Sequence, residues 1–251
     1  DKPFGVNVPM LYPQIEEIMN IIVEEGVKIV FTSAGNPKTW TSFLKEKGIT
    51  VVHVVSSVKF ALKAEAAGVD AVVCEGFEAG GHNGREETTT FTLIPMVKEV
   101  VKIPVIAAGG IATGRGMLAA MVLGADAAQI GSRFAATLES SAHENFKQTI
   151  VNVKDGDTHL TLKELAPVRL VKNKFFNDVQ RLYENNPTKE ELKDLLGRAR
   201  AKKGMFEGDL DEGELEIGQI AGLIDEIKPA KMVLQEIIDE FNEVKGLINK
   251  L

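Results

Sequence analysis

Short apolar segments alternate with amphipathic segments along the first 135 residues of the chain. The apolar segments are rich in β-branched residues, and several are apolar almost throughout. This composition is typical of strands that are buried on both faces of a parallel sheet. We therefore predict six strands, at residues 4–8, 28–32, 50–55, 71–75, 104–107 and 127–130.

The segments between these strands have the spacing of amphipathic helices, which we predict at residues 15–25, 39–47, 58–67, 91–101 and 115–123. Ser57 precedes the third of these helices and is a predicted N-cap. Four glycines lie just beyond predicted helix ends, where a left-handed backbone commonly closes a helix. They are Gly26, Gly48, Gly68 and Gly124.

Strands and helices that alternate at this spacing indicate either a (β/α)8 barrel or a doubly wound open sheet. Two glycine-rich loops favour the barrel. Residues 107–114 and 129–134 each follow a predicted strand, and backbone amides in two such loops can converge on one phosphate. In (β/α)8 barrels this phosphate site lies after strands seven and eight. We therefore predict an α/β fold of the TIM-barrel type.

Counting back from these two loops makes residues 4–8 the third strand, so this chain lacks the first two βα units of the barrel. Two such units require roughly 40–60 residues ahead of Asp1. A six-stranded remnant would expose two apolar sheet edges, which natural proteins avoid. We therefore expect an N-terminal segment that either was removed or precedes the given sequence.

The pattern changes after residue 135. Residues 141–204 are rich in charges and predict helices and loops, and residues 229–251 predict an amphipathic closing helix. We assign residues 1–140 to the partial barrel, with strands three to eight and the cofactor site. Residues 141–217 form a predicted helical substrate or cap subdomain. Residues 218–251 form a predicted return segment and C-terminal helix that packs on the barrel.

The overall charge and the cysteine content limit the function classes. The net charge of −7 argues against nucleic acid as a partner, because nucleic-acid binding usually needs a basic surface. No apolar run approaches the ~20 residues of a membrane span, so no membrane association is expected. The single cysteine, Cys74, excludes an internal disulfide and fits a reducing cytoplasm, which is the expected location. We interpret Cys74 as a small buried strand residue.

Residues 76–84 carry the most informative chemistry of the chain. This loop holds four glycines around His82 and follows a predicted strand. A histidine in such a loop can act as an acid or a base near neutral pH, although a structural histidine is the alternative. The pairs Gly80-Gly81, Gly109-Gly110 and Gly131-Ser132 all follow predicted strands, which favours a phosphate-bearing cofactor over simple tight turns.

Two polar residues of the predicted strands are further candidates for the ligand site at the open end of the barrel. Asn7 lies among apolar and small residues and must find hydrogen bonds from the backbone or from a ligand. Glu75 ends its strand, where it either faces the ligand or pairs with a neighbouring loop. His53 lies inside an apolar strand and is predicted to be a core histidine. Asp209 and Asp211 lack the other ligands of a calcium-binding loop, so no metal site is predicted.

Four segments together carry a family resemblance: residues 75–82, 107–112, 129–134 and 218–222, in this order and at suitable spacing. The chain resembles the FMN-dependent nitronate monooxygenase (2-nitropropane dioxygenase) superfamily along nearly its whole length. Within it, the likeness is closest to the flavoprotein enoyl-(acyl-carrier-protein) reductase II branch. Glu75 favours this branch, because nitronate monooxygenases typically carry glutamine at the matching position.

The resemblance implies roles for matching residues. His82 would lie over the reactive side of FMN and would position or protonate the substrate. NADH or NADPH would reduce the flavin, and hydride would pass to the β-carbon of the enoyl thioester. Stimulation by a monovalent cation is also implied, at no particular site. The residues implied to bind the cofactor are Asn7, Glu75, Gly80, Gly81, Gly109, Gly110, Gln129, Ile130, Gly131 and Ser132.

The chain departs from the family at its start. The first two βα units of family members carry glycine-rich loops that help to cover the isoalloxazine, so the flavin site of this chain is expected to be incomplete. An alternative reaction within the superfamily is the oxidation of alkyl nitronates, with His82 as the base. A third hypothesis is a barrel that binds a phosphate ligand without turnover.

The implied substrate is the thioester of acyl carrier protein, which is itself strongly acidic. Docking to this acidic chain therefore requires a local basic patch, and a solvated helix face is the alternative interpretation of each candidate. A homodimer is also expected. One candidate patch is Arg169, Lys172 and Lys174, and the other is Arg198, Arg200, Lys202 and Lys203.

Overall fold

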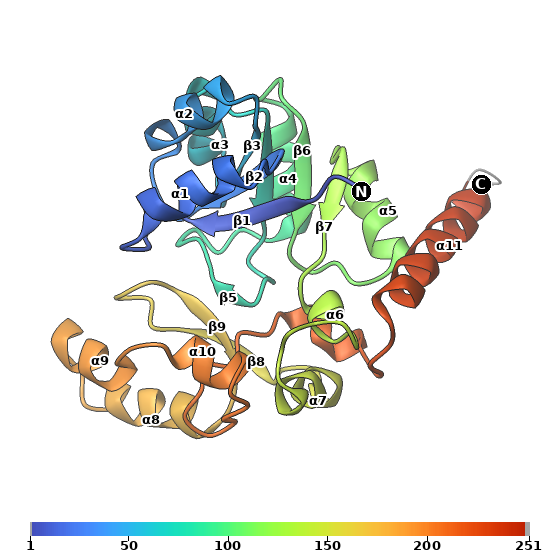
Figure 1. Ribbon diagram of the computed structural model, residues 1–251. Helices are drawn as coiled ribbons and strands as arrows, with labels where there is room; N and C mark the ends of the chain where they lie inside the picture. Colours follow the sequence, from blue (N-terminus) through green and yellow to red (C-terminus); the bar gives the residue numbers. More distant parts are fainter. Residues whose placement is uncertain (1, 249–251) are drawn as a thin grey trace.

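A six-stranded parallel sheet, curled into half a barrel, forms the larger part of the computed structural model, which describes residues 2–248 (Figure 1). Each strand pairs with the next one along the sheet, in the order β1-β2-β3-β4-β6-β7. This sequential order is that of a barrel and differs from the reversing order of a doubly wound sheet. The strands are β1 (Gly5–Pro9), β2 (Ile29–Ser33), β3 (Thr50–Val55), β4 (Ala71–Glu75), β6 (Val105–Ala108) and β7 (Ala127–Gln129).

The predicted α/β architecture is confirmed, and all six strands occur within one residue of their expected bounds. Helices connect them as predicted, except that the second is split by a 3-10 turn, η1 (Pro37–Thr39), in which the Asn36 side chain accepts a hydrogen bond from the Lys38 amide. The connecting helices are α1 (Ile15–Glu24), α2 (Thr41–Glu46), α3 (Val58–Ala66), α4 (Thr90–Lys98) and α5 (Gly114–Val122).

The predicted helix ends are also confirmed. Gly26, Gly48, Gly68 and Gly124 all have positive φ angles, between 67° and 109°. A residue with a Cβ would be strained there, so glycine sets where these helices end. Ser57 occupies the N-cap position of α3, but its side chain makes no capping hydrogen bond. Its buried hydroxyl lacks a partner among the described residues.

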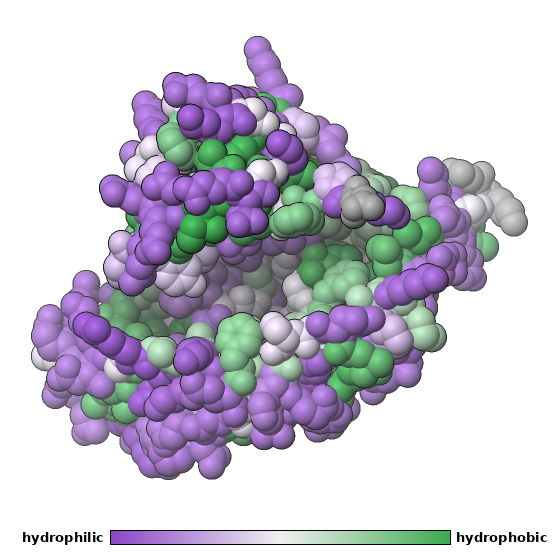
Figure 2. All heavy atoms as spheres, in the orientation of Figure 1, coloured by the Kyte–Doolittle hydropathy of each residue, from purple (hydrophilic) through white to green (hydrophobic). Residues whose placement is uncertain are grey.

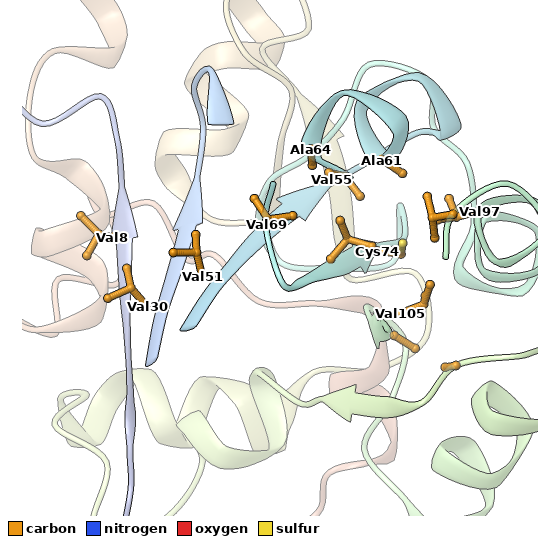
Figure 3. Close-up of a cluster of buried hydrophobic side chains, with 14 of the residues drawn as sticks. Val8, Val30, Val51, Val55, Ala61, Ala64, Val69, Cys74, Val97 and Val105 are labelled. Carbon is orange, nitrogen blue, oxygen red and sulfur yellow. The ribbon is translucent and has the colours of Figure 1, made fainter. Parts of the chain in front are cut away.

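Alternate residues of the strands pack on opposite faces of the sheet, as the two-residue period of a strand requires. The outer face packs against the connecting helices and includes Val30, Val51 and Cys74 (Figure 3). The inner face forms a smaller cluster around Val52 and Val73. Cys74 is fully buried, which confirms it as a small strand residue, and burial raises the pKa of its thiol to about 12.

A second, antiparallel sheet in the order β5-β9-β8 lies below the half-barrel in Figure 1. The prediction of helices and loops alone for residues 141–204 was wrong here, because β8 (Thr158–Thr161) and β9 (Val168–Val171) form strands. These strands have only four residues each and contain polar side chains, so they lack the apolar runs that predicted the parallel strands, although they pair with each other across a short connection. β9 pairs with β5 (Gly81–His82), in the loop after β4.

The remaining helices follow β7 along the chain, and the last of them returns to the half-barrel beside α5 (Figure 1). They are α6 (Ser132–Ala135), α7 (Glu144–Asn152), α8 (Lys174–Tyr183), α9 (Lys189–Leu196), α10 (Arg200–Met205), the 3-10 helix η2 (Gln219–Leu223) and α11 (Ala230–Ile248). The closing helix is confirmed as α11, although the end of the predicted range, residues 249–251, lies outside the described residues. None of the helices within residues 2–248 combines the length and apolarity needed to cross a membrane.

α11 packs against α5. Gly114 lies at this contact, since a Cβ there would come within 2.3 Å of the Ile237 carbonyl oxygen and the Phe241 amide nitrogen. Glu240 of α11 accepts a hydrogen bond of 2.7 Å from the Gly114 amide and pairs with Arg115. A carboxylate is favourable at this helix start, because it satisfies amides that have no partner within the helix.

Candidate active site

Loops at the carboxyl ends of the parallel strands line two adjoining cavities. The smaller, of about 270 Å³, lies between the loops after β4, β6 and β7 and the segment that precedes η2. The larger, of about 520 Å³, extends over β1, β2 and β3. Both cavities are lined by Glu75, Gly80, Gln129 and Glu216. In the orientation of Figure 1, a broad hollow separates the half-barrel from the part below it (Figure 2).

The smaller cavity has a wall of glycine backbone. Gly109 and Gly110 have φ angles of 90° and 69°, which only glycine adopts readily. A Cβ on Gly109 would lie 2.7 Å from the Gly76 carbonyl oxygen, so the loops after β4 and β6 touch through their backbones. At Gly131 a Cβ would meet no atom within 4 Å. Among the described residues, the amides of Gly110 and Gly131 donate to no protein acceptor.

Glu78 fixes the start of the loop after β4, a role that the sequence analysis missed. Its carboxylate accepts hydrogen bonds from the Thr90 amide and hydroxyl, at 2.9 and 3.1 Å. Its carbonyl oxygen accepts a hydrogen bond of 3.0 Å from the Gln219 amide. The Gly218 amide donates to the Ser132 hydroxyl at 3.1 Å. The segment before η2 is therefore bound to the loops after both β4 and β7.

His82 lies in the larger cavity on a loop that β9 holds in place. β5 pairs with β9, and the Asn83 amide donates to the Pro167 carbonyl at 2.9 Å. The Asn83 side chain also donates to the Ala79 and Gly81 carbonyls, at 2.9 Å each. The His82 side chain is 67% exposed, so its imidazole is accessible to a ligand in the cavity.

Two carboxylates of the segment before η2 approach His82. The His82 Nδ1 lies 3.5 Å from an oxygen of Glu216, which is 18% exposed. This contact raises the pKa of His82 above its ordinary value, with smaller contributions from Glu214 and Glu75. Glu214 itself is buried, and burial together with the neighbouring Glu216 raises its pKa to about 7. Both glutamates were missed as site residues, although their alternation with Leu215 and Ile217 marks a half-buried segment.

Glu75 ends β4 at the junction of the two cavities. Burial raises the pKa of its carboxyl to about 7, while the nearby His82 acts in the opposite direction. Acids with perturbed pKa values cluster at functional sites, because a catalytic acid or base needs a pKa close to the working pH.

His53 combines two features. It is buried, and its Nδ1 lies 2.8 Å from the Thr32 hydroxyl, as predicted for a core histidine. Burial lowers its pKa to about 4, so it is neutral at neutral pH. It also forms part of the wall of the larger cavity.

The structure brings ten of the eleven predicted site residues to the two cavities, and Ile130 is the exception. The Ile130 side chain packs against the core between sheet and helices instead. Asn7, Gly81 and His82 line the larger cavity. The smaller cavity is lined by Gly109, Gly110, Gly131 and Ser132, and both cavities share Glu75, Gly80 and Gln129.

Two residues of the predicted basic patches are not available for docking. Arg169 is 2% exposed, lies over the Phe77 ring at 4.5 Å and donates two hydrogen bonds to the Phe77 carbonyl. The Arg200 side chain is 15% exposed, lies over the Phe175 ring and donates to the carbonyls of Leu195, Leu196 and Glu212. Both arginines were assigned to patches wrongly, because charge in a sequence does not reveal burial.

Comparisons with known proteins agree on the family. A family model described as nitronate monooxygenase matches residues 2–240. A probable nitronate monooxygenase of Staphylococcus saprophyticus is 31% identical over 258 residues, covering 97% of this chain and 72% of the relative. One from Staphylococcus aureus is 33% identical over 240 residues, covering 90% of this chain and 66% of the relative. The chain therefore spans about two thirds to three quarters of the length of these relatives.

Solved structures extend the comparison. FabK from Thermotoga maritima is 43% identical, with a TM-score of 0.93 over 100% of this chain and 80% of that one. Nitroalkane oxidase from Streptomyces ansochromogenes is 27% identical, with a TM-score of 0.80 over 98% of this chain and 82% of that one. The resemblance predicted from the sequence motifs is thus confirmed for the superfamily, and the likeness to FabK, an enoyl-(acyl-carrier-protein) reductase II, agrees with the predicted branch.

Proposed function

The chain belongs to the nitronate monooxygenase family and is an oxidoreductase of the flavin-dependent type, and we propose that it acts as an FMN-dependent enoyl-(acyl-carrier-protein) reductase. NADH or NADPH is the proposed reductant. One observation carries the proposal: the glycine-lined cavity meets the cavity of His82 at Glu75, the residue that favours the reductase branch. The 43% identity to FabK, an enoyl reductase of this branch, against 27% to nitroalkane oxidase, supports the same choice.

The residues present fit FMN. Within residues 2–248, the amides of Gly110 and Gly131 are donors without protein acceptors, and the space beside Gly131 is open, as a phosphate cradle requires. We propose that Gly109, Ser132 and the backbone at Ile130 complete this cradle. The adjoining cavity of about 520 Å³ lies within the ~300–1,000 Å³ typical of small-molecule sites. Asn7, Glu75, Gly80, Gly81 and Gln129 are the proposed contacts of the remaining cofactor.

Bound FMN supplies hydride exchange between the nicotinamide and the enoyl thioester. The protein supplies orientation and a proton. His82 lies in the same cavity as Glu75, and its raised pKa favours the imidazolium, which can donate a proton at the α-carbon of the substrate. We assign this general-acid role to His82, and we assign to Glu75 the positioning of the flavin ring.

Nitronate oxidation is the second candidate function. The family model and the names of the curated relatives favour it. It would use the same cavity, with His82 as a base. The reductase is our first choice because the identity to FabK, at 43%, exceeds the 27% identity to nitroalkane oxidase.

Purified protein loaded with FMN separates these functions. The reductase predicts loss of crotonyl thioester that depends on NADH or NADPH. Oxygen uptake with an alkyl nitronate, without any nicotinamide, would instead support the second function. If His82→Ala retained the full activity, the histidine would be structural, and an absence of both activities with retained FMN would favour a binding protein. We also propose stimulation by a monovalent cation, which the same assay tests by comparing K⁺, Na⁺ and a bulky quaternary ammonium salt at equal ionic strength.

We further propose that the ring is completed by two βα units between β1 and β7. These strands are the edges of the six-stranded sheet among the described residues, and an open apolar edge is a liability. The partial coverage of the relatives supports this arrangement. The intact mass of the purified protein should exceed that of the 251 residues, and an equal mass would contradict units that precede Asp1.

Residues 141–217 are the proposed cap over the substrate, and residues 218–251 return the chain to the half-barrel. For docking of acyl carrier protein, the exposed side chains of Arg198, Lys202 and Lys203 remain candidates. Reversing these three charges should raise KM for the carrier-bound substrate more than for a CoA thioester. Equal effects on both substrates would exclude the patch. The expected homodimer is tested by sedimentation of the holoenzyme.

A further inference from the structure

We propose that Glu216 is a positioning residue for His82, which it orients through Nδ1 so that Nε2 is left to donate a proton to the substrate. The inference rests on the proposed function and adds to it the residue that sets the protonation and orientation of the acid. In many enzymes a carboxylate on one ring nitrogen fixes the tautomer and the direction of the other.

The local backbone is built to place Glu216 beside the histidine. A Cβ on Gly81 would lie 3.0 Å from Glu216 Oε2, so the absence of a side chain at Gly81 makes room for this carboxylate. A Cβ on Gly80 would lie 2.8 Å from the Glu216 carbonyl oxygen. Leu215 accepts a hydrogen bond of 3.0 Å from the Val171 amide of β9. Because β9 also pairs with β5, the same strand holds both His82 and the segment that carries Glu216.

The charged groups around His82 come from every element packed against it. Glu214 and Glu216 lie on the segment before η2, and Glu75 ends β4. Arg169 of β9 is turned to the Phe77 carbonyl. Lys63 of α3 and the neutral His53 of β3 line the same cavity. Of these groups, Glu216 makes the closest contact with the imidazole and is the largest cause of its raised pKa.

Glu216 lies where the two cavities adjoin. Glu216 lines both the glycine-walled cavity and the cavity of His82. Bound FMN, reduced by NADH or NADPH, would supply the hydride at the β-carbon and leave an enolate. In the proton-transfer step the Nε2–H bond of the imidazolium would break, and the electron pair of the enolate would form the C–H bond at the α-carbon. Solvent then returns a proton to Nε2, while the negative charge of Glu216 favours the imidazolium throughout.

The first test is a titration of His82 by NMR, which needs neither substrate nor turnover. The chain has four histidines, and the signal of His82 is the one that His82→Gln removes. Glu216→Gln should lower the pKa of His82, and Glu216→Asp should lower it less. Glu207 is an exposed carboxylate paired with Lys202, and Glu207→Gln should leave the pKa of His82 unchanged. An unchanged titration in Glu216→Gln, or an equal shift in Glu207→Gln, would overturn the proposal.

The second test uses the FMN-loaded enzyme. In Glu216→Gln, kcat for crotonyl thioester at pH 8 should fall roughly tenfold, at the lower end of what acid–base groups and their partners contribute. The alkaline limb of the pH profile should move to lower pH, and the fall in kcat should exceed any fall in the rate of flavin reduction by NADH or NADPH. A fall that is equal at all pH values would indicate a merely structural role. If the wild type reduces no enoyl thioester, the proposed function fails, but the NMR titration still decides the pairing.

Discussion

Replacing Gly80 with alanine tests the close contact between the loop after β4 and the segment before η2. The new methyl carbon would lie 2.5 Å from the Gly218 nitrogen, 2.6 Å from the Ile217 carbonyl carbon and 2.8 Å from the Glu216 oxygen. Ordinary contacts between heavy atoms are about 3.5–4.0 Å, so the two backbones must separate by roughly 1 Å. All three neighbours are main-chain atoms, so no side-chain rotation relieves the clash.

The expected cost follows from these contacts. Overpacking of this kind costs about 1–3 kcal/mol, and stretching the hydrogen bond from the Gln219 amide to Glu78 adds about 1 kcal/mol. We therefore expect Gly80→Ala to lower the free energy of unfolding by about 2–4 kcal/mol. With a urea slope of about 3 kcal/mol per M, the midpoint of urea unfolding should fall by roughly 1 M.

Gly131→Ala is the matched control. Its φ angle of −95° suits any residue, and its Cβ would meet no atom within 4 Å. Its stability should stay within about 0.5 kcal/mol of the wild type, while retention of FMN after gel filtration should fall because the methyl group would stand in the phosphate cradle. A Gly80→Ala midpoint equal to that of the wild type, or an equal loss in Gly131→Ala, would refute the reasoning.

Three further predictions concern packing, pH and charge. Gly114→Ala should lower the free energy of unfolding by about 1–3 kcal/mol, because the new methyl group forces α11 away from α5. Gly116→Ala, whose nearest contact would be 3.3 Å, should lower it less, and urea unfolding of both variants makes the comparison. Burial raises the pKa of Glu214 to about 7, so the folded state holds a proton that the unfolded state has released, and stability falls as the pH rises from about 4.5 through 7. Glu214→Gln should reduce the loss of stability between pH 5 and pH 8 by up to about 3 kcal/mol. If unfolding curves of the variant at these two pH values show the same difference in free energy as the wild type, the prediction is contradicted. Arg169→Met should lower the free energy of unfolding by about 1–3 kcal/mol, because the Phe77 carbonyl loses its hydrogen-bond donor. The ratio of KM for the carrier-bound substrate to KM for the CoA thioester should stay unchanged. A changed ratio would show that Arg169 belongs to the docking surface.

The sequence predicts the half-barrel well because local physics determines it. β3 and β4 occur at the predicted bounds, since short runs rich in valine have one favourable arrangement in a parallel sheet, even with His53 inside β3. The glycine-rich loops at Gly80 and Gly109 could also be found, because close approach of backbones leaves a visible requirement for glycine.

The second sheet and the carboxylates around His82 could not be predicted in the same way. β5 has two residues and pairs only with β9, far along the chain, and β9 includes a buried arginine that breaks the apolar pattern expected of a buried strand. Glu216 becomes a site residue only because Gly218 and Gln219 are bonded to Ser132 and Glu78. The alternation of residues 214–217 indicates a half-buried segment but does not reveal what that segment contacts.

The hydrogen bonds from Gln219 to Glu78 and from Gly218 to Ser132 also bear on the order in which parts of the chain fold. The pairs that complete the half-barrel lie close in sequence, whereas Gly218 and Ser132 are 86 residues apart. Loop-closure entropy delays such long-range contacts until much of the chain is already ordered. During synthesis on a ribosome, the strands can therefore collapse early, while the ligand-binding mouth matures only after residue 219 has emerged.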